Sequence, residues 1–85
     1  MNIELQDLSK GPVYLQVREQ IEAQISAKTI ASGETLPAPG VLAQKLAVDK
    51  GEIQRAYFEL EQAGLVARKN VKDFLGKMKT SYSIR

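Results

Sequence analysis

The clearest hydrophobic pattern in the chain begins just after Gly11-Pro12. Apolar residues then recur at every fourth position, as on one face of an amphipathic helix, at Val13, Val17, Ile21 and Ile25. The other faces carry polar side chains, among them Gln16, Gln20 and Gln24. The pattern predicts a helix over about 13–28 with one buried side.

A segment rich in glycine and proline follows, with the sequence TIASGETLPAPG at 29–40. Its glycines and prolines do not fit comfortably inside a regular helix or a central strand, so we expect a connector. Ile30 and Leu36 are isolated apolar residues within it, and we expect both to anchor the connector onto the core. Pro39 suits the first position of a helix, and the apolar residues that follow predict a short helix over about 39–47.

The strongest local signal belongs to a third helix. Asp49 followed by Glu52 is a helix-capping pattern, and apolar residues then recur at helical spacing at Ile53, Tyr57 and Leu60. We predict a helix over about 50–63, which stops at Gly64.

The C-terminal pattern is less uniform. Leu65 and Val66 begin a short apolar strand. Beyond Lys69 two interpretations stay open, because Tyr82 and Ile84 alternate as in a strand, whereas another set of residues fits a helix capped by Asn70. That second set is Val71, Phe74, Leu75 and Met78.

The predicted elements fit more than one architecture. Two helices joined by a tight turn, with a glycine and a strand after the second, outline a winged helix-turn-helix. A plain three-helix bundle has the same periodicities, because the apolar stripes are ordinary core positions. The pattern therefore predicts how a single domain of 85 residues packs, and leaves its ligand open.

Composition narrows the chemistry that the chain can perform. It has no cysteine and no histidine, which removes thiolate nucleophiles, the usual zinc frameworks and the commonest general base. No nucleophile and base pair, metal cluster or phosphate-cradling glycine loop is evident, so we expect no enzyme, no cofactor and no metal. No apolar run approaches the roughly 18–20 residues of a membrane span, and the start lacks a signal-peptide layout. We therefore expect a cytoplasmic protein without a membrane partner.

Charge is distributed unevenly along the chain. Residues 1–67 hold six Lys or Arg against nine Asp or Glu, whereas residues 68–85 hold six against one. A basic end is compatible with phosphate binding, and it is equally compatible with a solvated lysine-rich tail.

Several short motifs between residues 12 and 66 match a known family. They are Pro12 to Gln16, Gly33-Glu34-Thr35-Leu36-Pro37, Leu42-Ala43 with Leu46 and Val48, Arg55-Ala56-Tyr57, Glu59-Leu60-Glu61 and Gly64-Leu65-Val66. Together they resemble the N-terminal domain of GntR-type transcription regulators.

The resemblance implies a mainly α fold, a three-helix winged helix-turn-helix with a short β wing. It also implies a cytoplasmic bacterial regulator that binds a palindromic operator in duplex DNA as a homodimer. A further C-terminal effector or dimerisation domain is usual, and we do not expect one within these 85 residues. On this basis the single domain 1–85 has a family-like core at 12–66 and a divergent basic wing or C-terminal segment at 67–85.

The chain departs from the family at positions that contact DNA. The resemblance places Gly40 where the family has an arginine, and Ala38 where it usually has a serine. The family's Ser-Arg-Thr-Thr at the front of the recognition helix is matched by Asp49-Lys50-Gly51-Glu52. A second arginine, one turn later, is matched by Gln54, with Arg55 beside it.

Two interpretations of Asp49 and Glu52 stay open. Carboxylates accept hydrogen bonds from cytosine N4 in the major groove, so both could read bases. Alternatively, Asp49 is the cap of the third helix and Glu52 its capping-box partner.

The predicted wing and Phe58 are equally ambiguous. The run from Ala67 to Asp73 contains no glycine for the hairpin tip that the family shows. Its basic residues either reach the phosphate backbone or minor groove, or form a merely solvated charge run. Phe58 lies off the buried stripe, and it is either exposed to a protein partner or packed under the C-terminal segment.

Two functional hypotheses follow. The first is a DNA-binding regulator that works as a homodimer, with contacts to DNA from Lys50, Gly51, Gln54, Arg55, Arg68, Lys69 and Lys72. The second is a winged-helix module that has lost DNA affinity and binds a protein partner through Phe58 and the C-terminal segment. For the homodimer, we expect burial between chains of some of the residues Phe74, Leu75, Met78, Tyr82 and Ile84.

Overall fold

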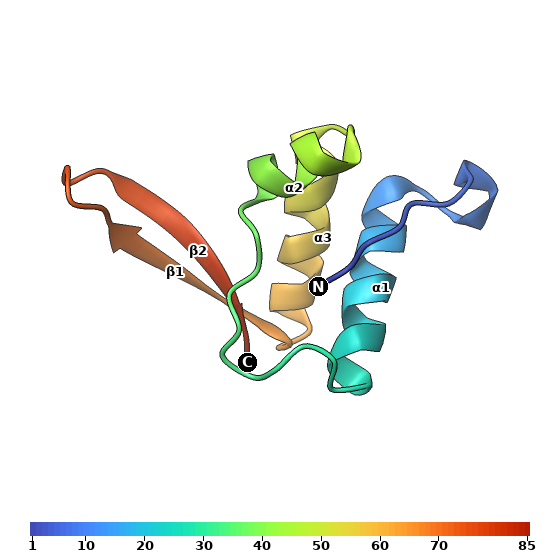
Figure 1. The fold of residues 1–85 in the computed structure, drawn as a ribbon, viewed down its shortest axis with the longest axis horizontal. Coiled ribbons are helices and arrows are strands. Elements are labelled where there is room, and N and C mark those ends of the chain that lie inside the picture. The colour runs from blue at the N-terminus through green and yellow to red at the C-terminus, as the bar shows by residue number, and fades with distance from the viewer.

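A computed structural model describes residues 1–85 as three helices followed by a two-stranded hairpin (Figure 1). A short 3-10 turn at Leu8–Lys10 precedes the elements α1 (Val13–Ser26), α2 (Pro39–Leu46), α3 (Lys50–Gln62), β1 (Val66–Lys72) and β2 (Met78–Ile84). Each predicted helix is present and ends one or two residues before its expected end. None is both long enough and apolar enough to cross a membrane. The winged helix-turn-helix architecture is confirmed.

The core lies where α3 meets α1, α2 and the base of the hairpin (Figure 1). The apolar stripe of α3 is completely buried, and the predicted stripe of α1 packs against it. Ile30 and Leu36 of the connector are buried, as expected. The largest fully buried side chains are those of Val17, Ile21, Ile53, Tyr57, Leu60 and Val66.

The C-terminal residues form a hairpin, so the helical interpretation is wrong. The two strands pair antiparallel, from Val66 opposite Ile84 at the base to Lys72 opposite Met78 near the tip. A helix over residues 70–78 would remove the backbone pairing of residues 70–72 with residues 78–80, which leads the chain back to the core at Ile84. Extended strands instead bury Val66 and Ile84 in the core.

The connector between α1 and α2 pairs with the free edge of β2. Gly33 N donates to the Ile84 carbonyl at 2.7 Å, and Ile84 N donates to the Glu34 carbonyl at 2.8 Å. Leu36 N donates to the Tyr82 carbonyl at 2.8 Å. The base of β2 is therefore hydrogen-bonded on both edges, which satisfies backbone groups that would otherwise be buried without partners.

The hairpin turns at residues 73–77, further along the chain than the sequence suggested. The expectation that the wing lacks a tip glycine is wrong, because both strands are seven residues long and carry the turn to Gly76. Gly76 has a φ of +81°, a left-handed conformation that a side chain would strain.

An N-terminal strap, residues 1–6, runs along the polar face of α1 (Figure 1). The Gln24 side-chain amide donates to the Asn2 carbonyl at 2.6 Å, and its oxygen accepts from Asn2 N at 3.4 Å. Gln20 makes the same pair of bonds with Glu4, at 2.6 and 2.9 Å. Gln16 is buried, and its side-chain oxygen accepts from the backbone N–H of Gln6 at 2.7 Å. The glutamines expected on open faces of α1 are therefore covered.

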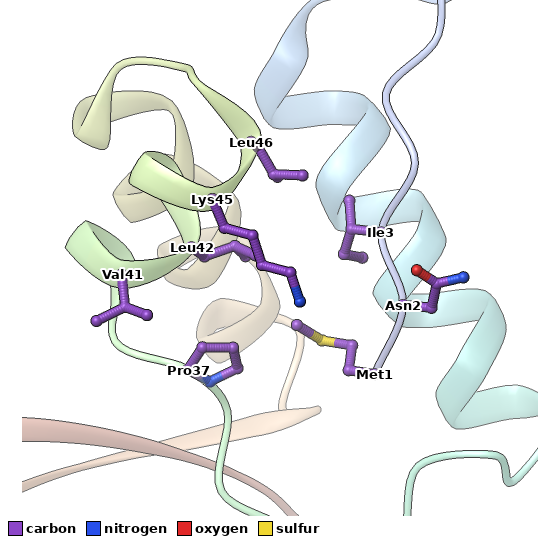
Figure 2. Close-up of a pocket in the computed structure, with 8 residues that line it drawn as sticks. All are labelled: Met1, Asn2, Ile3, Pro37, Val41, Leu42, Lys45 and Leu46. Carbon is purple, nitrogen blue, oxygen red and sulfur yellow. The ribbon is translucent and has the colours of Figure 1, made fainter.

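The strap also meets α2 at a small apolar pocket (Figure 2). Met1 and Ile3 form one wall, and Leu42 and Leu46 of α2 contribute to the other. The Lys45 side chain extends toward Met1 across this seam (Figure 2). Apolar contacts thus complement the glutamine bonds in holding the strap on the helical body.

Tyr57 joins α3 to both the connector and the wing. Its ring is fully buried, and its hydroxyl donates to the Pro37 carbonyl at 2.8 Å. The ring meets that of Tyr82 on β2 edge to face, with centroids 4.9 Å apart. Burial, reinforced by Tyr82, raises the pKa of Tyr57 above its ordinary value, so the hydroxyl remains a donor.

Replacing Tyr57→Phe should lower the free energy of unfolding by about 1 kcal/mol, because the Pro37 carbonyl loses its donor. Urea denaturation measures this difference, with the slope of the transition expected to stay unchanged. Tyr82→Phe is the matched control, since it removes a hydroxyl from the same ring pair without breaking a hydrogen bond in the chain. Equal losses in the two variants would contradict the role given to Tyr57.

Candidate nucleic-acid interface

The two helices α2 and α3 form the helix-turn-helix pair. α2 ends at Leu46, and its C-cap Ala47 has a left-handed φ of 58° that reverses the chain within a short turn. Asp49 then caps α3, with its carboxylate accepting from Gly51 N at 3.1 Å. The capping interpretation of Asp49 is confirmed, and one oxygen of its carboxylate is used by its own backbone.

Glu52 caps a different helix from the one expected. Its carboxylate accepts from Tyr14 N at 2.9 Å, in the first turn of α1. The N-cap residue of α1 is Pro12, whose side chain makes no capping hydrogen bond, so Glu52 supplies an acceptor to an otherwise unpaired donor. Its negative charge also lies at the positive end of the α1 dipole. The expected capping box is wrong, and Glu52 instead ties α3 to α1.

A groove opens between the start of α2, the first two turns of α3, and β2. Lys50 and Gln54 line it from α3, and Lys79 and Thr80 line it from β2. The structure thus brings two of the expected DNA-contacting residues together and adds two that sequence reasoning missed. The alternating pattern of residues 78–84 was the signal that could have placed Lys79 and Thr80 on a wing strand.

Glycines stand near the starts of both helices, Gly40 in the lining of the groove and Gly51 beside it in α3. Gly51 is exposed at the first turn of α3, beside its hydrogen bond to Asp49. A Cβ on Gly40 would lie 3.8 Å from Cδ and Cε of Lys50, an ordinary van der Waals contact. The methylenes of Lys50 therefore lie next to the start of α2.

Arg55 lies apart from the residues that line the groove. Its guanidinium stacks over the Tyr14 ring of α1, 3.8 Å from the centroid, and its Nε is 3.3 Å from Oε2 of Glu59. Glu59 also forms an ion pair with Arg18 of α1. Hydrogen bonds from Arg18 and then Arg55 hold the pKa of Glu59 below its ordinary value, although desolvation opposes them. Arg55 is thus held on the α1 side of α3.

The expected wing cations are present on both faces of the hairpin. Arg68 Nε lies 3.3 Å from Oε2 of Glu61 on α3. Arg68 and Lys72 share the face that carries Tyr82, whereas Lys69 lies on the opposite face. Lys69 and Lys72 are exposed.

The apolar residues of the C-terminal region divide into two groups. Ile84 is buried in the core, so it is not available between chains, whereas Tyr82 is partly buried against Tyr57. The expectation that some of these apolar residues lie between chains stays a prediction. Phe58 of α3 is 54% exposed, so the C-terminal segment does not bury it. The physical reason is that the base of the hairpin packs on α3 while its tip extends away (Figure 1). The remaining residues, Phe74, Leu75 and Met78, are exposed.

The helix-turn-helix and the first wing strand coincide with a known family. Residues 13–73 match the family model of bacterial regulatory proteins, gntR family. The chain belongs to the GntR family. This GntR domain is 36% identical over 58 residues to the uncharacterized HTH-type transcriptional regulator YhcF of Bacillus subtilis (strain 168). The aligned residues are 68% of this chain and 48% of the relative, so the match spans about half of the relative's length.

The GntR fold is also similar to that of a solved structure from Sulfolobus acidocaldarius. This protein is YtrA, a GntR-family transcription factor. The similarity has a TM-score of 0.77 at 26% sequence identity, and it covers 99% of this chain and 78% of YtrA. The chain is accordingly a winged helix-turn-helix domain of the GntR transcription-factor type.

Replacing Glu59→Gln should change how the stability of this GntR domain depends on pH. A carboxylate with a lowered pKa stabilises the fold above its unfolded pKa, about 4.3, and this contribution disappears as the pH falls through the lower folded value. The wild-type protein should therefore lose more stability than Glu59→Gln below about pH 4.3, as measured by urea denaturation at a series of pH values. In an Arg18→Ala background the difference should shrink, because Arg18 is the main cause of the lowered pKa.

Proposed function

We propose that this GntR domain binds duplex DNA and regulates transcription, acting as a homodimer in the cytoplasm and without catalytic activity or a cofactor. The observation that carries the proposal is the groove lined by Lys50 and Gln54 of the recognition helix and by Lys79 and Thr80 of the wing. Cations and amides on one surface suit a polyanion whose base edges carry donors and acceptors. The family relationship and the fold shared with YtrA support it.

Each residue of the groove has a chemical role in this proposal. Lys50 donates to guanine O6 or N7, and Gln54 pairs with adenine N6 and N7 in the major groove. Gly51 leaves room for the start of α3 to approach the DNA closely. Lys79 and Thr80 hold the wing to the adjoining backbone, because phosphate contacts fix the register of a protein on its duplex.

The remaining cations contact phosphates in this proposal. Lys69 and Lys72 are exposed and act from the hairpin. Arg55 and Arg68 each keep more than half of the side chain exposed, at 59% and 53%, while paired with a glutamate. They contribute to the DNA contacts from the flanks of the recognition helix, where their partners already fix their orientation.

Pairing of two copies completes the proposal. One winged helix makes few base contacts, and two copies reach half-sites one helical turn apart on a palindrome. Because Ile84 is buried in the core of each chain, the dimer contact uses other residues.

The wing cations should control general affinity for DNA. Arg68→Ala, Lys69→Ala and Lys72→Ala together should weaken binding to all sequences and reduce the log-log salt slope by up to about 0.9 for each phosphate that is no longer neutralised. Lys50→Ala with Gln54→Ala should mainly change sequence preference, at about 1–3 kcal/mol for each base that is no longer read.

Fluorescence anisotropy over a salt series with a generic duplex, together with the stoichiometry of the complex, measures these effects. Lys10→Ala is the control, since Lys10 belongs to the 3-10 turn before α1, a segment on the opposite side of the helices from the wing (Figure 1). An unchanged slope for the triple variant would contradict the role of the wing. No binding by the wild-type chain at low salt would contradict the proposed function itself.

Gly40→Arg should strengthen binding by restoring a cation where the family carries an arginine. The backbone at Gly40 is not left-handed, and a Cβ there meets only the flexible Lys50 side chain. The salt slope should steepen by about 0.9 in the same assay, as one further phosphate is neutralised. Gly40→Ala makes the same backbone change without the charge and should leave the slope unchanged. Equal slopes for the two variants would show that the start of α2 does not touch DNA.

A further inference from the structure

The tip of the wing carries exposed apolar side chains. Phe74 is 95% exposed, the most of any large apolar residue in the chain, and its neighbour Leu75 is 67% exposed. Met78, at the start of β2, is 60% exposed. The hairpin places this patch at the end of the molecule furthest from the helices (Figure 1). An apolar cluster of this kind marks a site of contact with a partner.

The loop that presents Phe74 and Leu75 is built by hydrogen bonds. The Asp73 carboxylate accepts from Leu75 N and Lys77 N, both at 2.9 Å. Asp73 N donates to the Lys77 carbonyl at 2.9 Å, and Gly76 N donates to the Asp73 carbonyl at 3.0 Å. The two apolar side chains are therefore held outward by a closed turn, so binding a partner through them costs little ordering entropy.

The surroundings of the tip are cationic. Lys72 and Lys79 flank the loop on the two strands, and Lys77 lies within it. Asp73 is the only acid among residues 68–85, and its carboxylate is occupied by the loop backbone. Two such tips would repel each other, whereas a polyanion would be attracted. Lys79 also lines the groove beside the recognition helix, so the tip continues that surface.

We propose that the wing tip is an apolar wedge, in which Phe74 and Leu75 insert between two base pairs from the minor groove and bend the duplex. Phe and Leu are among the side chains that partly unstack base steps in this way, and the resulting bend lies toward the major groove. The flanking lysines neutralise the phosphates of the strands that the wedge separates. The wedge favours flexible pyrimidine–purine steps, such as TA, because these unstack most easily. This inference rests on the proposed DNA-binding function and adds shape recognition to it.

The test measures affinity and bending together on a duplex of about 30 base pairs with a central TA step, labelled at both ends for energy transfer. The wild-type protein should shorten the end-to-end distance by a bend of about 20° or more. Phe74→Ser with Leu75→Ser should bind about tenfold more weakly, because no apolar side chain then stacks on the bases, and should leave the duplex straight. Both residues are exposed, so the variant keeps its fold, which circular dichroism verifies.

Two controls separate the wedge from general effects. Leu8→Ser replaces another exposed apolar residue, 70% exposed and remote from the wing, and should change neither affinity nor bending. Lys77→Ala should weaken binding and lower the salt slope, while the bound duplex stays bent.

The other outcomes overturn the wedge in distinguishable ways. DNA binding with equal bending by the wild type and the double variant, or with no bending by either, leaves the proposed function in place and removes the wedge. Loss of self-association in sedimentation, or of binding to vesicles of phosphatidylcholine and phosphatidylserine, with DNA binding intact would assign the tip to a second copy or a membrane. Absence of duplex binding by the wild type would remove both proposals.

Discussion

The relation between α3 and the wing depends on one buried side chain, Tyr57. Its hydroxyl is bonded to the connector at Pro37 and its ring packs on Tyr82 of β2, so α3 cannot shift without moving both. The connector is in turn hydrogen-bonded along the free edge of β2. Because these contacts are buried and mutually dependent, the walls of the groove have a fixed separation. A groove with fixed walls can present side chains from a helix and a strand to the same duplex.

Hydrogen bonds and ion pairs within the helical body occupy the carboxylates of α3 and its N-cap. By sequence, the negative charges of Asp49 and Glu52 offset the positive charges of Lys50 and Arg55 at the front of α3. In the structure Asp49 caps α3, Glu52 caps α1, and Glu59 is shared by Arg18 and Arg55. Asp49 and Glu52 satisfy backbone donors that helix starts leave unpaired, and Glu59 joins α3 to α1 through Arg18. The departures from the family's DNA-contacting pattern are thus partly structural devices, and the cations of the wing balance them.

Much of the fold follows from local spacing. The three helices, the buried stripes of α1 and α3, the anchoring residues Ile30 and Leu36, and the cap at Asp49 were all predicted from residues within one or two turns of each other. Periodicity and capping act over such short distances, so the sequence alone determines them. The same short motifs carried the resemblance to the family. For the site, they predicted the recognition helix and therefore the place of Lys50 and Gln54, which share one face.

Tertiary structure decided everything that depends on a distant partner. The strap covers Gln20, and Glu52 binds the backbone of Tyr14. Neither contact could be predicted from the spacing of neighbouring residues. By spacing alone the C-terminal residues fitted a helix or a strand, and the paired strands are the form that buries Val66 and Ile84 in the core. The hairpin therefore turns near Gly76, and Lys79 lines the groove. Arg55 follows Gln54 in sequence, yet its contacts with Tyr14 of α1 and with Glu59 hold it on another side of α3. A sequence specifies which faces must be covered, but only the packed chain determines what covers them, because burial is shared among all the elements that meet at the core.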